Sequence, residues 1–168
     1  MEPESLFFRG TFLMKFLAEE LDRARREISE IEECNCDAIY SKYSIEPLVL
    51  HEDEIRKDLT TGYRVSDPMF LIRHLEDLEY TKCRVVEYRI PFDGDERLFM
   101  FTTRALPYYP FGRLEDNAFV ISVKEGEELY ISDYEYNLTL LKDCLEIIAE
   151  AVKCYNSDLK AIITELTG

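Results

Sequence analysis

Two groups of side chains in this sequence are of the kind that bind metal ions. Cys34 and Cys36 stand one residue apart, a C-x-C spacing with no second Cys/His pair at the distance a zinc site needs. The run from His51 to Glu54, together with Asp58, offers clustered oxygens of the kind hard divalent cations prefer, but such a run is far more often a solvated acidic loop. We therefore predict no metal and no cofactor.

Nucleophilic and phosphate-transfer chemistry has little support in the sequence. The chain has two histidines, His51 and His74, and neither lies in a recognisable motif. There is no G-x-S-x-G elbow, P-loop or G-x-G-x-x-G, and six glycines leave little for a phosphate-binding loop. We expect a protein that is not an enzyme.

The aromatic run at residues 106–111 is the best candidate for a recognition surface. Two prolines stiffen it, and its rings offer contact area at a low entropic cost. The more common role of such rings is to cover the edge of a sheet or the base of the long helix. Flanking arginines would suit an anion, so the candidate recognition loop comprises Arg104, Tyr108, Tyr109, Phe111 and Arg113.

Composition limits the classes of partner. The 168 residues fit one domain, and 46% hydrophobic content is enough for a core. A formal net charge of −15 argues against binding nucleic acid or an anionic membrane. Five cysteines cannot all pair within the chain, which favours reduced thiols. No apolar run approaches membrane length and the first residues are acidic, so we expect a cytoplasmic protein.

The most regular feature is a heptad pattern near the C-terminus. Its apolar residues alternate in steps of three and four, which predicts one long helix with a seam that must be buried against another helix. We expect a homodimer that closes around this seam, which consists of Leu138, Leu141, Leu145, Ile148, Val152, Tyr155, Leu159, Ile162 and Leu166. A helix at residues 5–31 shows a shorter pattern that includes Met14, Leu17, Ala24 and Ile31, and could fill the seam within one chain instead.

Between these two helices the pattern changes to alternation. The alternation predicts strands at 46–50, 83–92, 98–103, 117–124 and 129–131. Helical spacing predicts a helix at 69–80, and turn residues predict turns at 60–62 and 93–95. The expected fold is therefore α+β, a small antiparallel sheet packed by an N-terminal helix and a long C-terminal helix. We divide it into an α+β body at 1–132 and the long helix of the same domain at 133–168.

The second half of the sequence resembles the amino-terminal region of uncharacterised prokaryotic defence-type effector proteins. The residues that carry the resemblance are Tyr88–Asp95, Leu98-Phe99, Pro107, Pro110, Phe119–Ile121, Tyr155-Asn156 and Leu159. In such proteins the module senses or oligomerises, and a separate effector domain follows, in some cases of Toll/interleukin-receptor type. The resemblance implies a role and carries no active-site residue.

These observations favour a non-enzymatic sensing or oligomerisation module that regulates or positions a partner effector domain, with antiviral defence as the setting that the resemblance implies. Two alternatives stay open. One is a domain that binds a small molecule or nucleotide signal between the sheet and the first helix. The other is an acidic inhibitor whose surface mimics nucleic acid.

Overall fold

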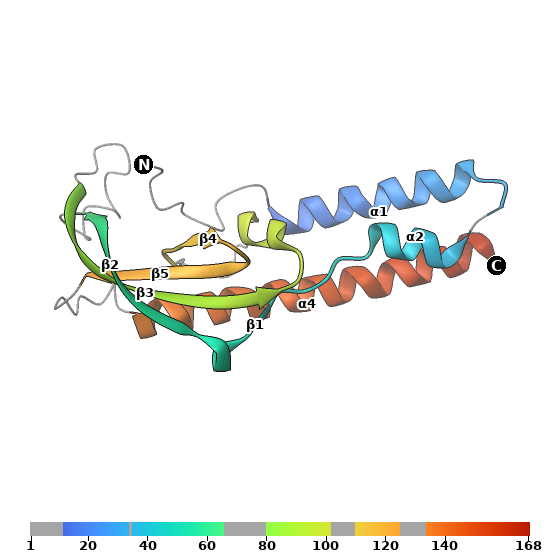
Figure 1. The fold of residues 1–168 in the computed structure, drawn as a ribbon. Helices are drawn as coiled ribbons and strands as arrows, with labels where there is room; N and C mark the ends of the chain where they lie inside the picture. The colour runs from blue at the N-terminus through green and yellow to red at the C-terminus, as the bar shows by residue number, and fades with distance from the viewer. Residues whose placement is uncertain (1–11, 34, 66–79, 102–109, 125–133) are drawn as a thin grey trace. The chain divides into compact units, whose positions relative to one another are not determined.

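The computed structural model describes residues 12–33, 35–65, 80–101, 110–124 and 134–168. The α+β class is confirmed: the described residues form three α-helices and a five-stranded sheet (Figure 1). The elements are α1 (Leu13–Glu30), α2 (Cys36–Tyr43), β1 (Val49–Leu50), η1 (Glu52–Glu54), β2 (Arg56–Val65), β3 (Tyr80–Asp93), η2 (Glu96–Met100), β4 (Arg113–Glu115), β5 (Ala118–Lys124) and α4 (Tyr134–Thr167).

Strand β3 organises the sheet. Its strand order is β1-β3-β5-β4, with β2 also paired to β3. The β2–β3, β3–β5 and β4–β5 pairings are all antiparallel. Apolar residues alternate along β3 and β5, so the register sets Ile90 opposite Phe119 and Tyr88 opposite Ile121 on one face. Ile90, Phe119 and Ile121 are buried, which makes this face the core side of the sheet.

The tight hairpin of the sheet joins β4 to β5. Asp116 and Asn117 both have positive φ, at 50° and 57°, the conformation that a two-residue type I′ hairpin requires. The turn predicted at 93–95 does exist, with Gly94 at φ 107°. It leads into the 3-10 helix η2 rather than the strand predicted at 98–103, so that prediction was wrong where the chain is described. A Cβ on Gly94 would lie 2.2 Å from the carbonyl oxygen of Pro47, so the turn requires glycine.

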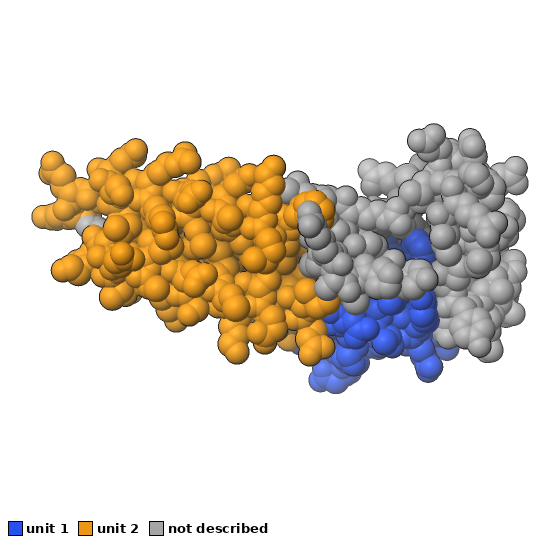
Figure 2. Space-filling model, turned by 180° about the vertical axis from the view of Figure 1, so that it is seen from behind, with its two compact units in different colours: residues 1–7, 50–92, 108–143 blue, residues 8–49, 93–107, 144–168 orange. Residues whose placement is uncertain are grey.

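The chain divides into two compact units, each discontinuous in sequence (Figure 2). We call residues 1–7, 50–92 and 108–143 the sheet unit, and residues 8–49, 93–107 and 144–168 the helical unit. Both units take residues from 1–132 and from 133–168. Helix α4 runs unbroken from Tyr134 to Thr167 and supplies residues to both units.

In the sheet unit, the first turns of α4 meet the apolar face of the sheet. The rings of Tyr88 and Tyr134 stack with centroids 3.8 Å apart and planes 10° from parallel. One turn further along, the Asn137 side chain accepts a hydrogen bond from the Phe111 N–H at 2.9 Å, and it is buried. Leu141 follows with no exposed surface. These contacts anchor the start of the helix.

In the helical unit, α1, α2 and the rest of α4 lie side by side (Figure 1). The predicted long helix is confirmed, and most of its seam is buried within a single chain. The buried seam residues of α4, counting Leu141 in the sheet unit, are Leu141, Leu145, Ile148, Val152, Tyr155, Leu159 and Ile162. Leu138 is partly exposed and Leu166 is 48% exposed. A second copy is not needed to cover the buried stretch, so it gives no support to a dimer through the seam.

The helix predicted at 5–31 begins at Leu13 in the described residues, and its buried face is set differently from the prediction. Leu13 is 1% exposed, whereas Met14, which was assigned to the apolar pattern of this N-terminal helix, is 69% exposed. Leu17, Ala24 and Ile28 are buried as expected. Ile31 lies just past the helix and is 39% exposed. The face therefore begins one residue earlier than the heptad count suggested.

Of the other predicted elements, some are confirmed, some are wrong and some lie outside the described residues. The strands predicted at 83–92 and 117–124 are confirmed by β3 and β5. The strand predicted at 46–50 is reduced to Val49–Leu50, and α2 was missed. The turn predicted at 60–62 was wrong, because those residues lie within β2. The helix predicted at 69–80 lies outside the described residues up to 79, and the strand predicted at 129–131 lies outside them entirely. No helix in the described part of the chain is long and apolar enough to cross a bilayer.

Candidate functional site: the outer edge of the sheet

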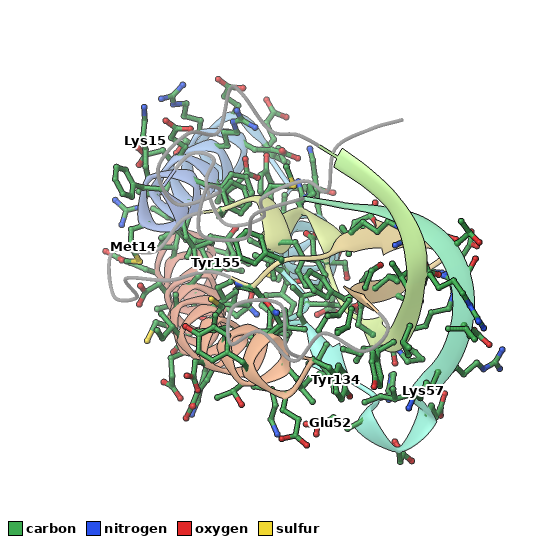
Figure 3. The ribbon with its side chains drawn as sticks, turned by 90° about the vertical axis from the view of Figure 1, so that its left-hand side faces the viewer. Met14, Lys15, Glu52, Lys57, Tyr134 and Tyr155 are labelled. Carbon is green, nitrogen blue, oxygen red and sulfur yellow. The ribbon has the colours of Figure 1, made fainter. Side chains whose placement is uncertain are left out.

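Strand β2 forms an outer edge of the sheet. Its pairing with β3 is continuous over ten residues, from Arg56 opposite Arg89 to Val65 opposite Tyr80. Within the described residues no strand pairs with its other edge, and the side view shows β2 at the rim with Lys57 on it (Figure 3). An edge strand offers a row of backbone N–H and C=O groups to a further strand. Ten residues is long for such an edge, since strands average five to six.

The first half of β2 is exposed on both faces. All six residues from Arg56 to Thr61 are exposed, although side chains alternate between the two faces of a strand. Leu59, in the middle of the run, is 50% exposed. Strands usually gain stability by burying one face, and this stretch buries neither. The described residues therefore leave this half of the strand uncovered on both faces.

The charges of β2 do not match those of β3. Arg56 lies opposite Arg89, and Asp58 lies opposite Glu87. Like charges directly opposite one another in an antiparallel pair are destabilising. Among the described residues Arg56 and Asp58 form no hydrogen bond or ion pair, whereas the Lys57 ammonium lies 5.6 Å from the centre of the Tyr88 ring. The β2 sequence, with Arg56, Lys57 and Arg64 against Asp58, carries a net charge of +2 in a chain of −15.

Arg113, a member of the predicted recognition loop, has its donors committed to the sheet. Its guanidinium donates to Glu87 at 2.7 Å, to Glu115 at 2.9 Å and to Ser122 at 3.0 Å. Although burial alone would lower the pKa of Arg113, the bonds to Glu87 and Glu115 raise it above its ordinary value. Arg89 also pairs with Glu115. The arrangement crosslinks β3, β4 and β5, which is a structural role and leaves Arg113 unavailable to a free anion.

A hollow of about 490 Å³ lies in the sheet unit beside this network. Arg56 and Arg89 line it together with Glu54 and Asp116, and Pro91 and Ala118 complete the lining. Two guanidinium groups on neighbouring strands could hold an anionic group. The two carboxylates in the same lining oppose that use, because they add negative charge where an anion would sit.

The remaining members of the predicted loop are only partly placed. Arg104, Tyr108 and Tyr109 lie outside the described residues. Phe111 is half-buried, and its N–H is bound by Asn137 on α4, so this end of the loop covers the base of the long helix. That is the alternative role which the sequence left open for these rings.

The two groups of candidate metal ligands are the acidic run at residues 51–54 with Asp58, and the cysteines Cys34 and Cys36. Of the predicted acidic run, Glu52–Glu54 forms η1, and Glu52 pairs with Lys142 of α4 at 2.9 Å. Among the described residues no three His, Cys, Asp or Glu side chains gather where they could hold a metal ion. Cys36 is a free thiol whose sulfur lies 3.4 Å from the hydroxyl of Thr167, and Cys34 lies outside the described residues.

Sequence reasoning missed the edge strand because Thr60, Thr61 and Gly62 suggest a turn. A signal for a strand was present: Thr60, Thr61, Tyr63 and Val65 are of residue types that are enriched in strands. Comparison with known proteins supplies no analogy, since no family model, curated protein or solved structure matches this chain.

Proposed function

We propose that this chain is a non-enzymatic module that self-associates and thereby regulates or positions a partner domain. The observation that carries the proposal is the outer edge of β2, which is long, continuously paired on one side and exposed on both faces over residues 56–61. Proteins normally shorten, bend, cover or charge such an edge, and β2 carries Arg56 and Lys57. Strand addition is nevertheless a common mode of association. The resemblance to defence-type modules supports the same role.

The proposal moves the association surface from α4 to the sheet. The seam of α4 is occupied between Leu141 and Ile162, so a dimer through it would have to open the helical unit. Adding a strand to β2 requires no such opening, because the six residues in question are already exposed. Association through β2 is therefore compatible with the folded chain.

Sedimentation equilibrium over a hundredfold range of concentration tests the proposal. Leu59 on β2 and Leu166 at the end of α4 form a matched pair, being 50% and 48% exposed. We expect a wild-type dimer that Leu59→Lys weakens, because a lysine on an edge strand discourages pairing. Leu166→Lys should leave it unchanged. A wild-type chain that stays monomeric throughout would contradict the proposal, and a dimer that only Leu166→Lys weakens would return the interface to α4.

Arg56 and Arg89 in the lining of the hollow favour a second candidate, a domain that binds a small anionic ligand, although Glu54 and Asp116 in the same lining oppose it. A ligand that binds only the folded state raises its melting temperature in a saturable way. Inorganic phosphate is the simplest probe. An upshift that Arg89→Gln abolishes would favour this candidate, and no upshift in the wild type would remove it.

A further inference from the structure

We infer that the hollow of about 490 Å³ beside the β4–β5 hairpin binds a free amino acid with an aliphatic side chain. Arg56 and Arg89 bind its carboxylate. Glu54 and Asp116 bind its ammonium group. The second candidate function places a plain anion in this hollow, whereas an amino acid carries both charges. The inference does not depend on self-association, because all of these residues belong to one chain.

The floor of the hollow is one face of the sheet. Arg89 and Pro91 lie two positions apart on β3, so their side chains point to the same face. The register sets Arg56 of β2 opposite Arg89, and Ala118 of β5 opposite Pro91. Two guanidinium groups therefore share one row of the sheet, and a small apolar surface lies in the next row. This arrangement suits a ligand that carries a carboxylate beside an apolar side chain.

The two carboxylates of the lining come from either side of this floor. Glu54 is the last residue of η1, and the extended backbone of Ile55 separates it from Arg56. Residues 54 and 56 therefore project to the same side of the chain, with their Cα atoms about 6.6 Å apart. An α-amino acid can contact both, because its ammonium and carboxylate groups are attached to the same carbon atom. Asp116, in the β4–β5 turn, adds a second acceptor for the ammonium.

Binding such a ligand breaks no ion pair that the described residues form. The side chains of Glu54, Arg56 and Asp116 make no hydrogen bond or ion pair with any described residue, although opposite charges line the hollow. Arg89 pairs with Glu115, but a guanidinium has five N–H donors and can bind a second carboxylate. Since Arg56 and Arg89 lie directly opposite each other, a carboxylate between them also offsets their repulsion.

The balance of charge in the lining selects the class of ligand. Two arginines and two carboxylates make the lining formally neutral in a chain of net charge −15. A plain anion meets the two carboxylates and a plain amine meets the two guanidinium groups, whereas an amino acid sets each charge against its opposite. The volume lies within the range of small-molecule sites, roughly 300–1,000 Å³. Pro91 and Ala118 favour an aliphatic side chain, so L-leucine is the probe we choose.

Isothermal titration calorimetry with three related probes tests the inference. L-leucine carries both charges, isocaproate lacks its ammonium, and isoamylamine lacks its carboxylate. We expect the wild type to bind leucine about tenfold or more tightly than either analogue. Glu54→Gln should weaken leucine about tenfold and narrow its advantage over isocaproate, and Arg56→Gln should weaken it equally and narrow its advantage over isoamylamine. Arg26→Gln and Glu30→Gln make the same changes at exposed positions of α1, and should bind leucine as the wild type does.

The outcomes distinguish the amino acid from the other ligand classes. A wild type that binds no leucine, or leucine binding that persists in both Glu54→Gln and Arg56→Gln, overturns the inference. Isocaproate or phosphate bound as tightly as leucine also overturns it, and returns the hollow to the plain anion of the second candidate. Circular dichroism establishes that each variant is folded, and sedimentation of the same samples reports self-association separately.

Discussion

Asn156 of α4 and Ile45 are joined by two hydrogen bonds in the helical unit. The Asn156 side-chain oxygen accepts from the Ile45 N–H at 3.0 Å, and its amide nitrogen donates to the Ile45 carbonyl at 2.8 Å. Ile45 is 4% exposed, so its backbone groups lie where water cannot easily replace the carboxamide. Next to this pair, the Tyr155 hydroxyl donates to the Tyr43 carbonyl at 2.7 Å. One turn of α4 thus holds the segment that follows α2.

Replacing Asn156 should destabilise the protein through this segment. Asn156→Ala leaves a buried N–H and C=O unpaired, and we expect a loss of about 1–3 kcal/mol in the free energy of unfolding. Asn156→Asp keeps an acceptor for the Ile45 N–H but loses the donor to its carbonyl, and should not restore wild-type stability. Urea unfolding followed by circular dichroism measures both. Ser157→Ala, at the exposed neighbouring position, should change stability little, and an equal loss there would contradict this account.

Tyr155 should make stability depend on alkaline pH. Burial raises its pKa from 10.0 to about 12, with the negative charge of Glu20 adding to the effect. A tyrosine ionises by losing a proton, so between pH 10 and 12 the unfolded chain ionises first and the folded state loses stability. The stabilisation from Tyr155 is complete below pH 10 and disappears as the pH rises through about 12.

The measurement is urea unfolding of the wild type and Tyr155→Phe at a series of pH values from 8 upward. The stability advantage of the wild type should shrink above pH 10. Tyr136→Phe is the control, because the Tyr136 hydroxyl bonds to none of the described residues. An advantage that stays constant with pH would rule out this titration.

The sequence predicted the helix α4 and its buried face, but not which segments of the chain cover that face, for one physical reason. Apolar periodicity shows which face of a helix is buried, but not what covers it. Tyr155 lies at the expected seam with Asn156 beside it, yet their polar atoms bind the backbone at Tyr43 and Ile45, more than a hundred residues away. Backbone carbonyls leave no mark in a sequence. Strand β2 was missed because Thr60, Thr61 and Gly62 suggest a turn, and its position at the edge of the sheet could not be read from the sequence either. An edge strand is defined by the neighbour it lacks, and no residue type encodes that.

The register of α1 gives a direct test of side-chain burial. Leu13 is 1% exposed and Met14 is 69% exposed, although the heptad count placed Met14 on the buried face. Leu13→Ala should cost about 2–5 kcal/mol through lost burial and the resulting cavity. Met14→Ala should change stability by less than about 0.5 kcal/mol, as expected for an exposed position. Urea unfolding decides between the two faces, and a larger loss for Met14→Ala would restore the heptad register.

The stabilisation that Arg113 gives the sheet should depend on pH in the acid range. Arg113→Met removes the donors to Glu87, Glu115 and Ser122, and should cost about 1–3 kcal/mol at neutral pH. The bond from Arg113 holds the pKa of Glu115 below its ordinary value of 4.5, so the stabilisation is present above pH 4.5 and is lost as the pH falls through the lower pKa. The cost of the substitution should therefore be smaller near about pH 3.

Urea unfolding at both pH values checks the Arg113 prediction. Arg26→Met, which removes an exposed arginine of α1, is the control and should change stability little at either pH. A cost for Arg113→Met that is the same in acid would mean that its packing, and not its charge, matters.

The seam of α4 should behave as the core of a single chain. Ile148 has no exposed surface, and Ile148→Ala should cost about 2–5 kcal/mol. If a second chain covered the seam, unfolding would be linked to dissociation and its midpoint would rise with protein concentration. Because the chain covers Ile148 itself, we expect the variant to lose the same stability at either end of a hundredfold concentration range.

The measurement is urea unfolding of Ile148→Ala and of Leu59→Lys, whose dimer is already weakened, at both concentrations. A loss from Ile148→Ala that diminishes on dilution in the wild-type background would place the second copy on α4, and a loss that persists leaves β2 as the surface for association.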